Sequence, residues 1–350
     1  MAYRAVLTDA ATAGRAELTR LWLDNLPVRG DADAKLRWTY VDAPAGKGEA
    51  FVLRADDGSA AGCAGIQRRE LAYRGTSIRA ALLADFAIDR RHRSGLPALT
   101  LQRAVKRHVE TAYDLSYGFP NDQALAIHRR TGYHLLGRMS RFVRVLRHGG
   151  YLARRFGQPL AGRAIGAIVD PALMAGTALR AMREGAALEL HWLDDVDARF
   201  DRLWAEASPS YPIACRRTAA LLRWRFLRKP DQRYTVAALI DRRSDALRGY
   251  AIVQDGPSGG AELADLFGAD PAAIDALLAL LIRSLYDRGF TTVSIRYLGD
   301  PRLLPLLDHH RFSLRQSDRA VIVHPTASWP IHLDARRASA WYITELDEDT

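Results

Sequence analysis

The segment Leu82–Ala98 has the composition of an anion-binding site. Apolar residues up to Ile88 indicate a strand, and a short basic turn containing Ser94 and Gly95 leads into a helix that begins near Pro97. The first backbone N–H groups of a helix have no partner within it, and together with the helix dipole they attract negative charge. A pyrophosphate group would suit this position. The commoner phosphate-binding patterns, G-x-x-x-x-G-K-[ST] and G-x-G-x-x-G after a strand, are absent from the sequence.

A second spacing pattern follows the next predicted strand. It combines an asparagine, an alanine, an apolar residue next to a histidine, and a glycine–aromatic pair: Asn121, Ala124, Ile127-His128 and Gly132-Tyr133. An imidazolium at His128 could act as a general acid, because a group whose pKa lies near neutrality donates protons well at pH 7. The alternative is that His128 is a surface or core-edge histidine with no role in proton transfer.

The first segment resembles the acyl-CoA pyrophosphate loop of the GNAT (GCN5-related N-acetyltransferase) superfamily, [QR]-x-x-G-x-[GA] after a strand. Arg93 takes the first position of this pattern and Ala98 the last. Leu96 stands at the usual glycine position, with Gly95 one residue earlier, and Pro97 lacks an N–H donor. These departures lead us to expect a reshaped loop or a lower cofactor affinity.

The second segment resembles the GNAT signature N-x-x-A-x-x-[LI]-Y-x-x-x-G-[FY]. The resemblance implies a mixed α/β fold and an acyl-CoA cofactor, with acetyl-CoA as the expected donor. It also implies that Asn121 contacts the pantetheine arm, and that His128 replaces a tyrosine that often protonates the leaving thiolate. The cofactor contacts expected from both segments are Phe86, Ile88, Arg93, Ser94, Gly95, Leu96, Pro97, Ala98 and Asn121.

Catalysis of the GNAT type needs little covalent chemistry, since holding a thioester and an amine together supplies much of the acceleration. Two backbone N–H groups near Phe86–Ile88 are expected to polarise the thioester carbonyl. Asp85 is our first candidate for the base that takes a proton from the amine, because burial could raise its pKa. Asp265 occupies the same place in the second half of the chain, so Asp85 could instead hold a turn. Glu49 and Glu70, near other strands, stay open as alternative bases.

The elements that position these residues are predicted from the spacing of apolar side chains. A helix should contain Leu18, Leu21 and Trp22 at helical spacing. Further helices are expected at Pro97–Thr111 and Asp122–Arg130. Strands are expected near Tyr3–Leu7, Ala50–Arg54, Ala61–Tyr73, Ile78–Asp89, Asp114–Phe119 and Tyr133–Val145.

Short segments recur in the same order and at nearly constant spacing, which indicates an internal duplication. The matching pairs are Arg20-Leu21-Trp22 with Arg202-Leu203-Trp204, Leu36-Arg37-Trp38 with Leu222-Arg223-Trp224, and Leu83-Ala84-Asp85 with Leu263-Ala264-Asp265. We therefore expect two tandem GNAT-like domains, at residues 1–148 and 188–326. Residues 149–187 would be a basic helical linker, and residues 327–350 a C-terminal tail.

The second copy has lost the features of the first. Its long helix follows an acidic turn with Asp270, whose side chain would compete with a phosphate for the first N–H groups. Leu307 and Arg311 replace the residues that match His128 and Gly132. We expect this copy to shape the acceptor site or complete an interface rather than bind CoA. The tail ends in acidic residues and could fold back over a cleft or stay mobile.

The composition indicates which partners, which compartment and which kinds of site to expect. The net charge of +10 comes mainly from scattered arginines, which is as consistent with a coding bias as with an anionic partner. Two cysteines suit a reducing compartment and provide neither a disulfide framework nor a cysteine-rich metal site. The sequence shows neither a signal peptide nor a long apolar run, so we expect a cytoplasmic protein. We also expect no metal site. The linker 149–187 could contact an anionic membrane surface, but packing between the domains is the favoured interpretation.

Three functions fit these observations. The first is an acyl-CoA-dependent N-acyltransferase that acts on the amine of a small molecule, of an amino sugar or nucleotide sugar, or of a protein. The two-copy layout resembles that of bacterial acyltransferases linked to surface polysaccharide or secondary metabolism. The second is a Fem-type transferase that uses aminoacyl-tRNA, which the positive charge favours and the CoA-type loop disfavours. The third is a CoA-binding or scaffolding pseudoenzyme, which Leu96 and the missing tyrosine favour. The sequence disfavours a nucleic-acid partner and leaves the oligomeric state open.

Overall fold

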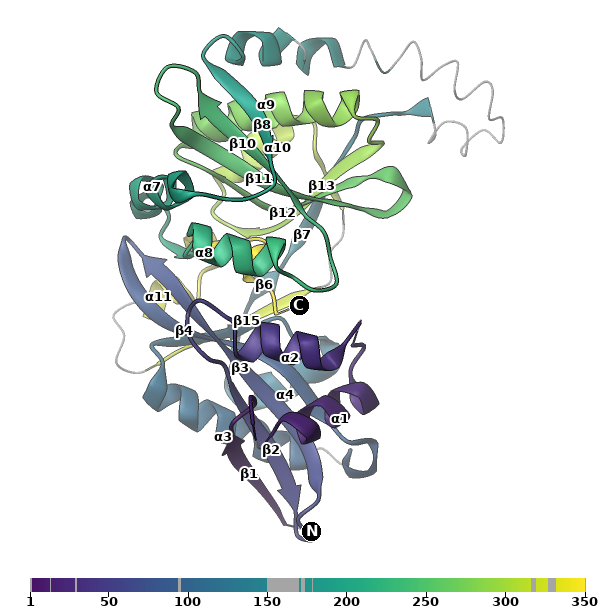
Figure 1. Ribbon diagram of the computed structural model, residues 1–350. Coiled ribbons are helices and arrows are strands. Elements are labelled where there is room, and N and C mark those ends of the chain that lie inside the picture. Colours follow the sequence, from purple (N-terminus) through teal and green to yellow (C-terminus); the bar gives the residue numbers. More distant parts are fainter. Residues whose placement is uncertain are drawn as a thin grey trace.

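A computed structural model of the chain describes residues 2–12, 14–28, 30–93, 96–149, 170, 174–177, 179–315, 319–326 and 332–349. They form two α/β copies stacked end to end, the first in purple to blue and the second in teal to yellow-green in Figure 1. The elements of the first copy are β1 (Tyr3–Thr8), α1 (Arg15–Asn25), α2 (Ala32–Tyr40), β2 (Glu49–Ala55), β3 (Ala60–Tyr73), β4 (Thr76–Ile88), α3 (Leu96–Ala112), β5 (Leu115–Gly118), α4 (Asp122–Arg130), β6 (His134–Arg138) and β7 (Ser140–Val145).

The second copy repeats this order, as the duplicated segments predict. Its elements are β8 (Leu188–Leu193), α7 (Ala198–Ala207), β9 (Ile213–Cys215), α8 (Ala219–Leu222) with a π-helical turn (Arg223–Leu227), β10 (Thr235–Asp241), β11 (Leu247–Asp255), β12 (Ala261–Gly268), α9 (Pro271–Asp287), β13 (Thr292–Gly299), α10 (Leu303–His309), β14 (Ser313–Arg315) and β15 (Ala320–Pro325). The C-terminal segment adds α11 (His332–Ala335), β16 (Trp341–Ile343) and a final 3-10 turn (Glu345–Asp347).

The two copies exchange a strand. Strand β15 of the second copy lies between β5 and β6 of the first, while β7 of the first lies between β13 and β14 of the second. The single strand predicted at Tyr133–Val145 is therefore wrong. The chain divides at the buried Met139 into β6 and β7, which pair in different sheets. Each copy therefore completes the sheet of the other.

Helices cover both faces of the first sheet. On one face α3 buries Leu101, Val105 and Val109, the apolar stripe predicted from the sequence. On the other face α1 buries Leu18, Leu21 and Trp22, also as predicted, beside α2. The sequence interpretation did not identify α2, whose start is capped by the Asp31 side chain accepting the Asp33 N–H. This helix matters because it forms one wall of the candidate site.

Most of the predicted linker, including residues 150–169, 171–173 and 178, lies outside the described residues. Its described part packs against the second copy, at the top of Figure 1, and not between the copies as expected. The Arg144 guanidinium donates to Thr177 Oγ1 at 2.8 Å, and Arg180 donates to the His309 carbonyl at 3.4 Å. Across the described ranges, no helix combines the length and apolar character that a membrane span requires.

The C-terminal tail folds back between the two copies. Strand β16 pairs with β9 on one side and with β13 on the other, and so links the two sheets. The terminus, marked C in Figure 1, then lies at the junction beside β15 and α2. Of the two behaviours expected for this segment, the structure shows the folded one.

Candidate active site

The central feature of the site is a gap in the first sheet. Strands β4 and β5 pair in parallel from Ala80 with Leu115 to Leu83 with Gly118, and β5 then ends. Strand β4 continues to Ile88, paired only with β3 in the described sheet, and its other edge is open. A bulge at Asp85, which has a φ of +49°, bends β4 at this point. An aspartate adopts this left-handed conformation more readily than most residues, so it suits the bulge.

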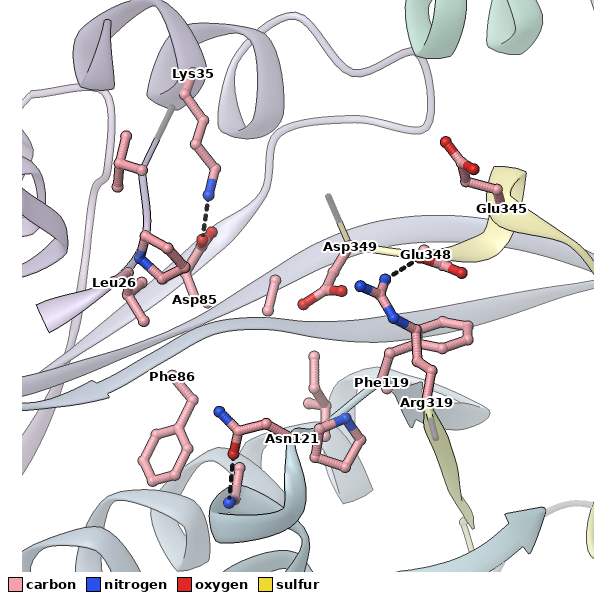
Figure 2. Close-up of a pocket in the computed structure, with 18 of the residues that line it drawn as sticks. Leu26, Lys35, Asp85, Phe86, Phe119, Asn121, Arg319, Glu345, Glu348 and Asp349 are labelled. Atoms are coloured by element: carbon pink, nitrogen blue, oxygen red, sulfur yellow. Dashed lines mark hydrogen bonds and ion pairs between the residues drawn. The ribbon is translucent and has the colours of Figure 1, made fainter. Parts of the chain in front are cut away.

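A cavity of about 790 Å³ passes through this gap. Its lining comes from both sides of the sheet, with α3 and α4 on one side and α2 and the second copy on the other (Figure 2). The lining includes Gln102, Val105, Ala124 and His128 from the first side, and Ala34, Lys35, Trp38, Lys229 and Asp231 from the second. Such a channel could admit a long ligand from one side and a second reactant from the other.

Asp85 lies at the bulge but is fully engaged. Its Oδ1 is 2.8 Å from Lys35 Nζ, and its Oδ2 accepts the Tyr40 hydroxyl at 2.7 Å. Burial disfavours the Lys35 ammonium, but the adjacent Asp85 carboxylate outweighs burial and raises the pKa of Lys35. Burial and the Asp85 charge also raise the pKa of Tyr40. These contacts favour the holding role considered for Asp85 over proton transfer from the amine.

His128 lines the channel in a neutral form. Burial lowers the pKa of its imidazole to about 4, and its ring packs edge-on against Phe86 and Tyr133. The imidazolium expected from the sequence is therefore not the species present at pH 7, because no carboxylate in the described structure offsets the burial. The Nδ1 atom has no hydrogen-bond partner among the described residues. A neutral ring with a free nitrogen can still donate or accept one hydrogen bond, depending on its tautomer.

The described residues of the predicted pyrophosphate loop, at the start of α3, are not part of the cavity lining. Ser94 and Gly95 are outside the described residues. Leu96 begins the helix and is 56% exposed. The Arg93 guanidinium donates to the Ile88 carbonyl at 3.1 Å and to Asn25 at 3.2 Å, which fixes the loop against β4 and α1. Pro97 and Ala98 are buried and contribute backbone rather than side chains to this surface.

Two further predicted cofactor residues line the cavity and one does not. Phe86 and Asn121 both face it (Figure 2). The Asn121 side chain accepts the Ala124 N–H at 2.9 Å and so caps α4. Its amide NH₂ group is left to donate elsewhere. Ile88 lies beyond the cavity, where its carbonyl binds Arg93.

The C-terminal tail contributes site residues that the sequence interpretation missed. Glu345, Glu348 and Asp349 all line the cavity, opposite Asp85 and Asn121 in Figure 2. Glu348 forms an ion pair with Arg319, and burial raises the pKa of Glu348 to about 7. Burial and the nearby Asp85 charge raise the pKa of Asp349 to about 6. Among the described residues, no other side chain forms a hydrogen bond or an ion pair with the Asp349 carboxylate, which its own backbone N–H approaches. The acidic end of the chain was the only signal of this role in the sequence.

Acidic groups outnumber basic ones in the cavity, although the chain as a whole carries a net charge of +10. Seven carboxylate side chains line it: Asp31, Asp85, Asp231, Glu262, Glu345, Glu348 and Asp349. Four basic side chains also do so: Lys35, Lys229, Arg296 and Arg319. An excess of negative charge in a partly desolvated chamber favours a cationic ligand.

In the described part of the second copy, the space that corresponds to the channel is filled by protein. Its strands β12 and β13 also separate after a short parallel ladder, but β16 fills the space between them. The Tyr342 hydroxyl donates to the Leu266 carbonyl of β12, while Ile343 pairs with Leu298 of β13. Asp270 caps α9 by accepting the Ala273 N–H at 2.8 Å, which confirms that a carboxylate occupies this helix start.

The chain thus consists of two fused copies of the fold of GCN5-related N-acetyltransferases. No family model matches the sequence, and no curated protein matches it. Solved structures resemble it over nearly its whole length. One is a probable N-acyltransferase from Enterococcus faecalis, with 11% identity and a TM-score of 0.66, over 93% of this chain and 72% of that chain.

Two other similar structures are described as GCN5-related N-acetyltransferases. The one from Anabaena variabilis has 14% identity and a TM-score of 0.62, over 92% of this chain and 73% of the other. The one from Kribbella flavida has 14% identity and a TM-score of 0.59, over 95% of this chain and 74% of the other. At these identities the likeness establishes the fold, and the chemistry has to be argued from the site itself.

Proposed function

We propose that this chain is an acyl-CoA-dependent N-acyltransferase, with acetyl-CoA as the donor and a primary amine as the acceptor. The acyl group would pass directly from donor to amine while both are bound. The observation that carries the proposal is the channel between β4 and β5, which connects the α3–α4 side of the sheet to an acidic chamber on the other side. A donor that enters from one side and an amine held on the other would meet at the open edge of β4.

The residues present fit CoA on three counts. The start of α3 is exposed at Leu96, so its free N–H groups and the neighbouring Arg90 are available to a pyrophosphate. Gln102 is buried in the channel wall, and its Oε1 lacks a partner among the described residues. This oxygen can accept an amide N–H of a pantetheine arm, and the free NH₂ group of Asn121 can donate to a carbonyl of the same arm. Leu96 and Pro97 make the loop less favourable than the usual pattern without closing it.

CoA would supply an acyl carbonyl activated as a thioester. The open edge of β4 near Phe86 offers backbone N–H groups that can hydrogen-bond to that carbonyl. Asp349 takes a proton from the amine, because its carboxylate lines the chamber and no other side chain of the described residues pairs with it. His128, which lines the channel, would donate a hydrogen bond to the sulfur of a bound thioester. Asp85 and Lys35 keep the bulge of β4 in place.

The acceptor is expected to be a small molecule or an amino sugar. The chamber is lined by α2, by the loop of the second copy around Asp231, and by the tail. Its excess of carboxylates suits an amine that arrives as an ammonium ion. The second copy would therefore shape the acceptor site, as expected from the sequence.

Titration calorimetry with acetyl-CoA, followed by a thiol-release assay with a panel of amines, tests the proposal. Binding with amine-dependent thiol release supports it. Binding without release from any amine would favour a non-catalytic CoA-binding protein instead. Absence of binding would reject the proposal and turn attention to aminoacyl-tRNA as the donor.

A further inference from the structure

The groove of the second copy that corresponds to the channel contains a peptide. In the first copy the space between β4 and β5 is open, whereas the space between β12 and β13 holds the chain's own residues 341–347. This segment makes backbone pairs with β13 and accommodates Tyr342 against β12, much as a ligand would occupy the groove. The segment that follows delivers Glu348 and Asp349 into the chamber of the first copy.

A buried network fixes the middle of this segment. Arg217, which is fully buried, contacts Asp265 at 3.1 Å and Asp347 at 3.6 Å. The Thr344 hydroxyl donates to Asp265 at 2.7 Å, and the Thr344 N–H donates to Asp347 at 2.8 Å. Asp265 is the counterpart of Asp85 in the duplicated sequence. In the second copy this position binds the tail, whereas in the first copy it binds Lys35.

Arg225 holds the last turn of the segment by its backbone. Its Nε donates to the Leu346 carbonyl at 3.2 Å, and one of its terminal nitrogens donates to the carbonyls of Glu345 at 2.9 Å and Glu348 at 3.4 Å. A guanidinium suits this position, because its planar set of donors can serve several carbonyl oxygens at once. The side chain is 1% exposed and lies in the π-helical turn beside Trp224. Asp349 follows directly after this anchored turn.

We infer that the groove of the second copy is a binding site for the chain's own C-terminal segment, and that Arg225 is a positioning residue that places Asp349 in the chamber. The docked C-terminal segment then accounts for two features at once. It fills the cofactor groove of the second copy, and it supplies a carboxylate to the first copy. The role given to Asp349 depends on the proposed function, whereas the docking of the segment does not.

The experiment compares Arg225→Gln, Arg225→Lys and Arg228→Gln in the full chain. Arg228→Gln is the matched control, because it removes the same charge from an exposed residue directly after the same turn. Thr344→Val is a milder second variant that removes one anchoring hydroxyl and keeps the side-chain shape. Two measurements are made on each: hydrogen exchange of residues 341–349 against α9 as internal reference, and kcat and KM for acetyl-CoA and a reactive amine.

Arg225→Gln should raise exchange in residues 341–349 by about tenfold or more while exchange in α9 stays unchanged, because only the tail is released. It should lower kcat about tenfold or more with little change in the KM for acetyl-CoA, since misplacing a catalytic group affects the chemical step. Thr344→Val should shift both quantities in the same direction by less. Arg225→Lys should restore part of the loss, and Arg228→Gln should match the wild type.

Tail exchange that stays at the wild-type rate in both Arg225→Gln and Thr344→Val would overturn the docking site. A released tail with an unchanged kcat would overturn the positioning role and leave the proposed function standing. If the wild-type protein released no thiol with any amine, the proposed function would fail, but the exchange measurement would still decide whether the groove binds the tail.

Discussion

Trp38 and Trp224 stack on each other across the junction of the two copies, with ring centroids 4.9 Å apart and planes inclined by 20°. Each indole N–H donates to the main-chain carbonyl of the other residue at 2.8 Å. The two tryptophans are the matching residues of the duplicated segments Leu36-Arg37-Trp38 and Leu222-Arg223-Trp224. A reciprocal contact between equivalent residues places the approximate symmetry axis of the molecule between these two rings.

Replacing either tryptophan by phenylalanine should lower the free energy of unfolding by about 1–3 kcal/mol, because it leaves a buried carbonyl of the other without a donor. Only Trp38 lines the cavity, so Trp38→Phe should also change the KM for the amine, whereas Trp224→Phe should not. Denaturant unfolding and steady-state kinetics on the two variants check this. Equal effects of both variants on KM would show that the pair acts on the site only through stability.

The duplication was predictable because matching tripeptides record the common ancestry of α1 with α7 and of α2 with α8. The apolar stripe of α3 was equally clear, since a helix shows its buried face in local sequence. The exchange of β7 and β15 was not predictable. Residues on both sides of Met139 have the composition of one strand, and only partners far along the chain decide that β6 and β7 belong to different sheets.

The candidate site was predicted in part for the same physical reason. Asp85, Phe86, Asn121 and His128 belong to local patterns, and all four line the cavity. The environments of these residues could not be predicted from the sequence. The pKa of His128 depends on its burial, and the role of Asp85 depends on its ion pair with Lys35. The tail carboxylates were missed because no local pattern near Asp349 indicates that Arg225 binds the turn before it.

Asp349→Asn should lower kcat/KM by about 10²–10⁴-fold, the usual range for loss of a general base. In the wild type, kcat/KM should rise with pH up to about 6 and then level off, because burial raises the pKa of Asp349 to about 6 and only the ionised form accepts a proton. The variant should lose this acid limb and retain its affinity for acetyl-CoA. Asp308→Asn, at an exposed position on α10, is the control and should have no effect. Retention of the limb in Asp349→Asn would assign the base to another residue.

Asp85→Asn separates the two candidate bases. An asparagine tolerates the left-handed backbone at the bulge and can still bind Tyr40, but it leaves Lys35 without its counter-ion. We expect a fall in the free energy of unfolding of about 1–3 kcal/mol. The acid limb of kcat/KM should persist but move to lower pH, because the Asp85 charge helps to raise the pKa of Asp349. Lys35→Met, which breaks the same pair from the other side, should give a similar loss of stability. Disappearance of the acid limb in Asp85→Asn, with Asp349→Asn unaffected, would restore Asp85 as the base.

Reversing a charge beside the start of α3 should weaken acetyl-CoA binding. Arg90→Glu and Arg93→Glu should each raise the Kd by about tenfold at low salt, and the effect should shrink as salt screens the added charge. Arg93→Glu should have the larger effect, because it also breaks the contacts with Ile88 and Asn25. Arg243→Glu, at an exposed turn of the second copy, is the control for net charge. Titration calorimetry at two salt concentrations decides the matter, and unchanged affinities in both variants would mean that the loop assignment is wrong.

His128→Phe tests whether the buried imidazole contributes through a hydrogen bond. A phenyl ring can keep the packing against Phe86 and Tyr133, and Nδ1 has no partner among the described residues to lose. We expect kcat to fall by about 10²–10³-fold, the scale of one lost hydrogen bond to a developing charge. The acid limb assigned to Asp349 should remain, because a group with a pKa of about 4 does not titrate near pH 6.

The same variant has a second, independent readout in the pH dependence of stability. Burial lowers the pKa of His128 to about 4 in the folded protein, while the unfolded chain binds its proton near pH 6.5. Between these two values the unfolded state carries the extra proton, so this residue makes stability fall as the pH is lowered, by up to about 1.4 kcal/mol per pH unit. His128→Phe should remove that contribution, and its unfolding free energy should fall less than that of the wild type between pH 6.5 and pH 4.5. Identical slopes in urea titrations of the two proteins would show that the imidazole is not neutral in the folded protein.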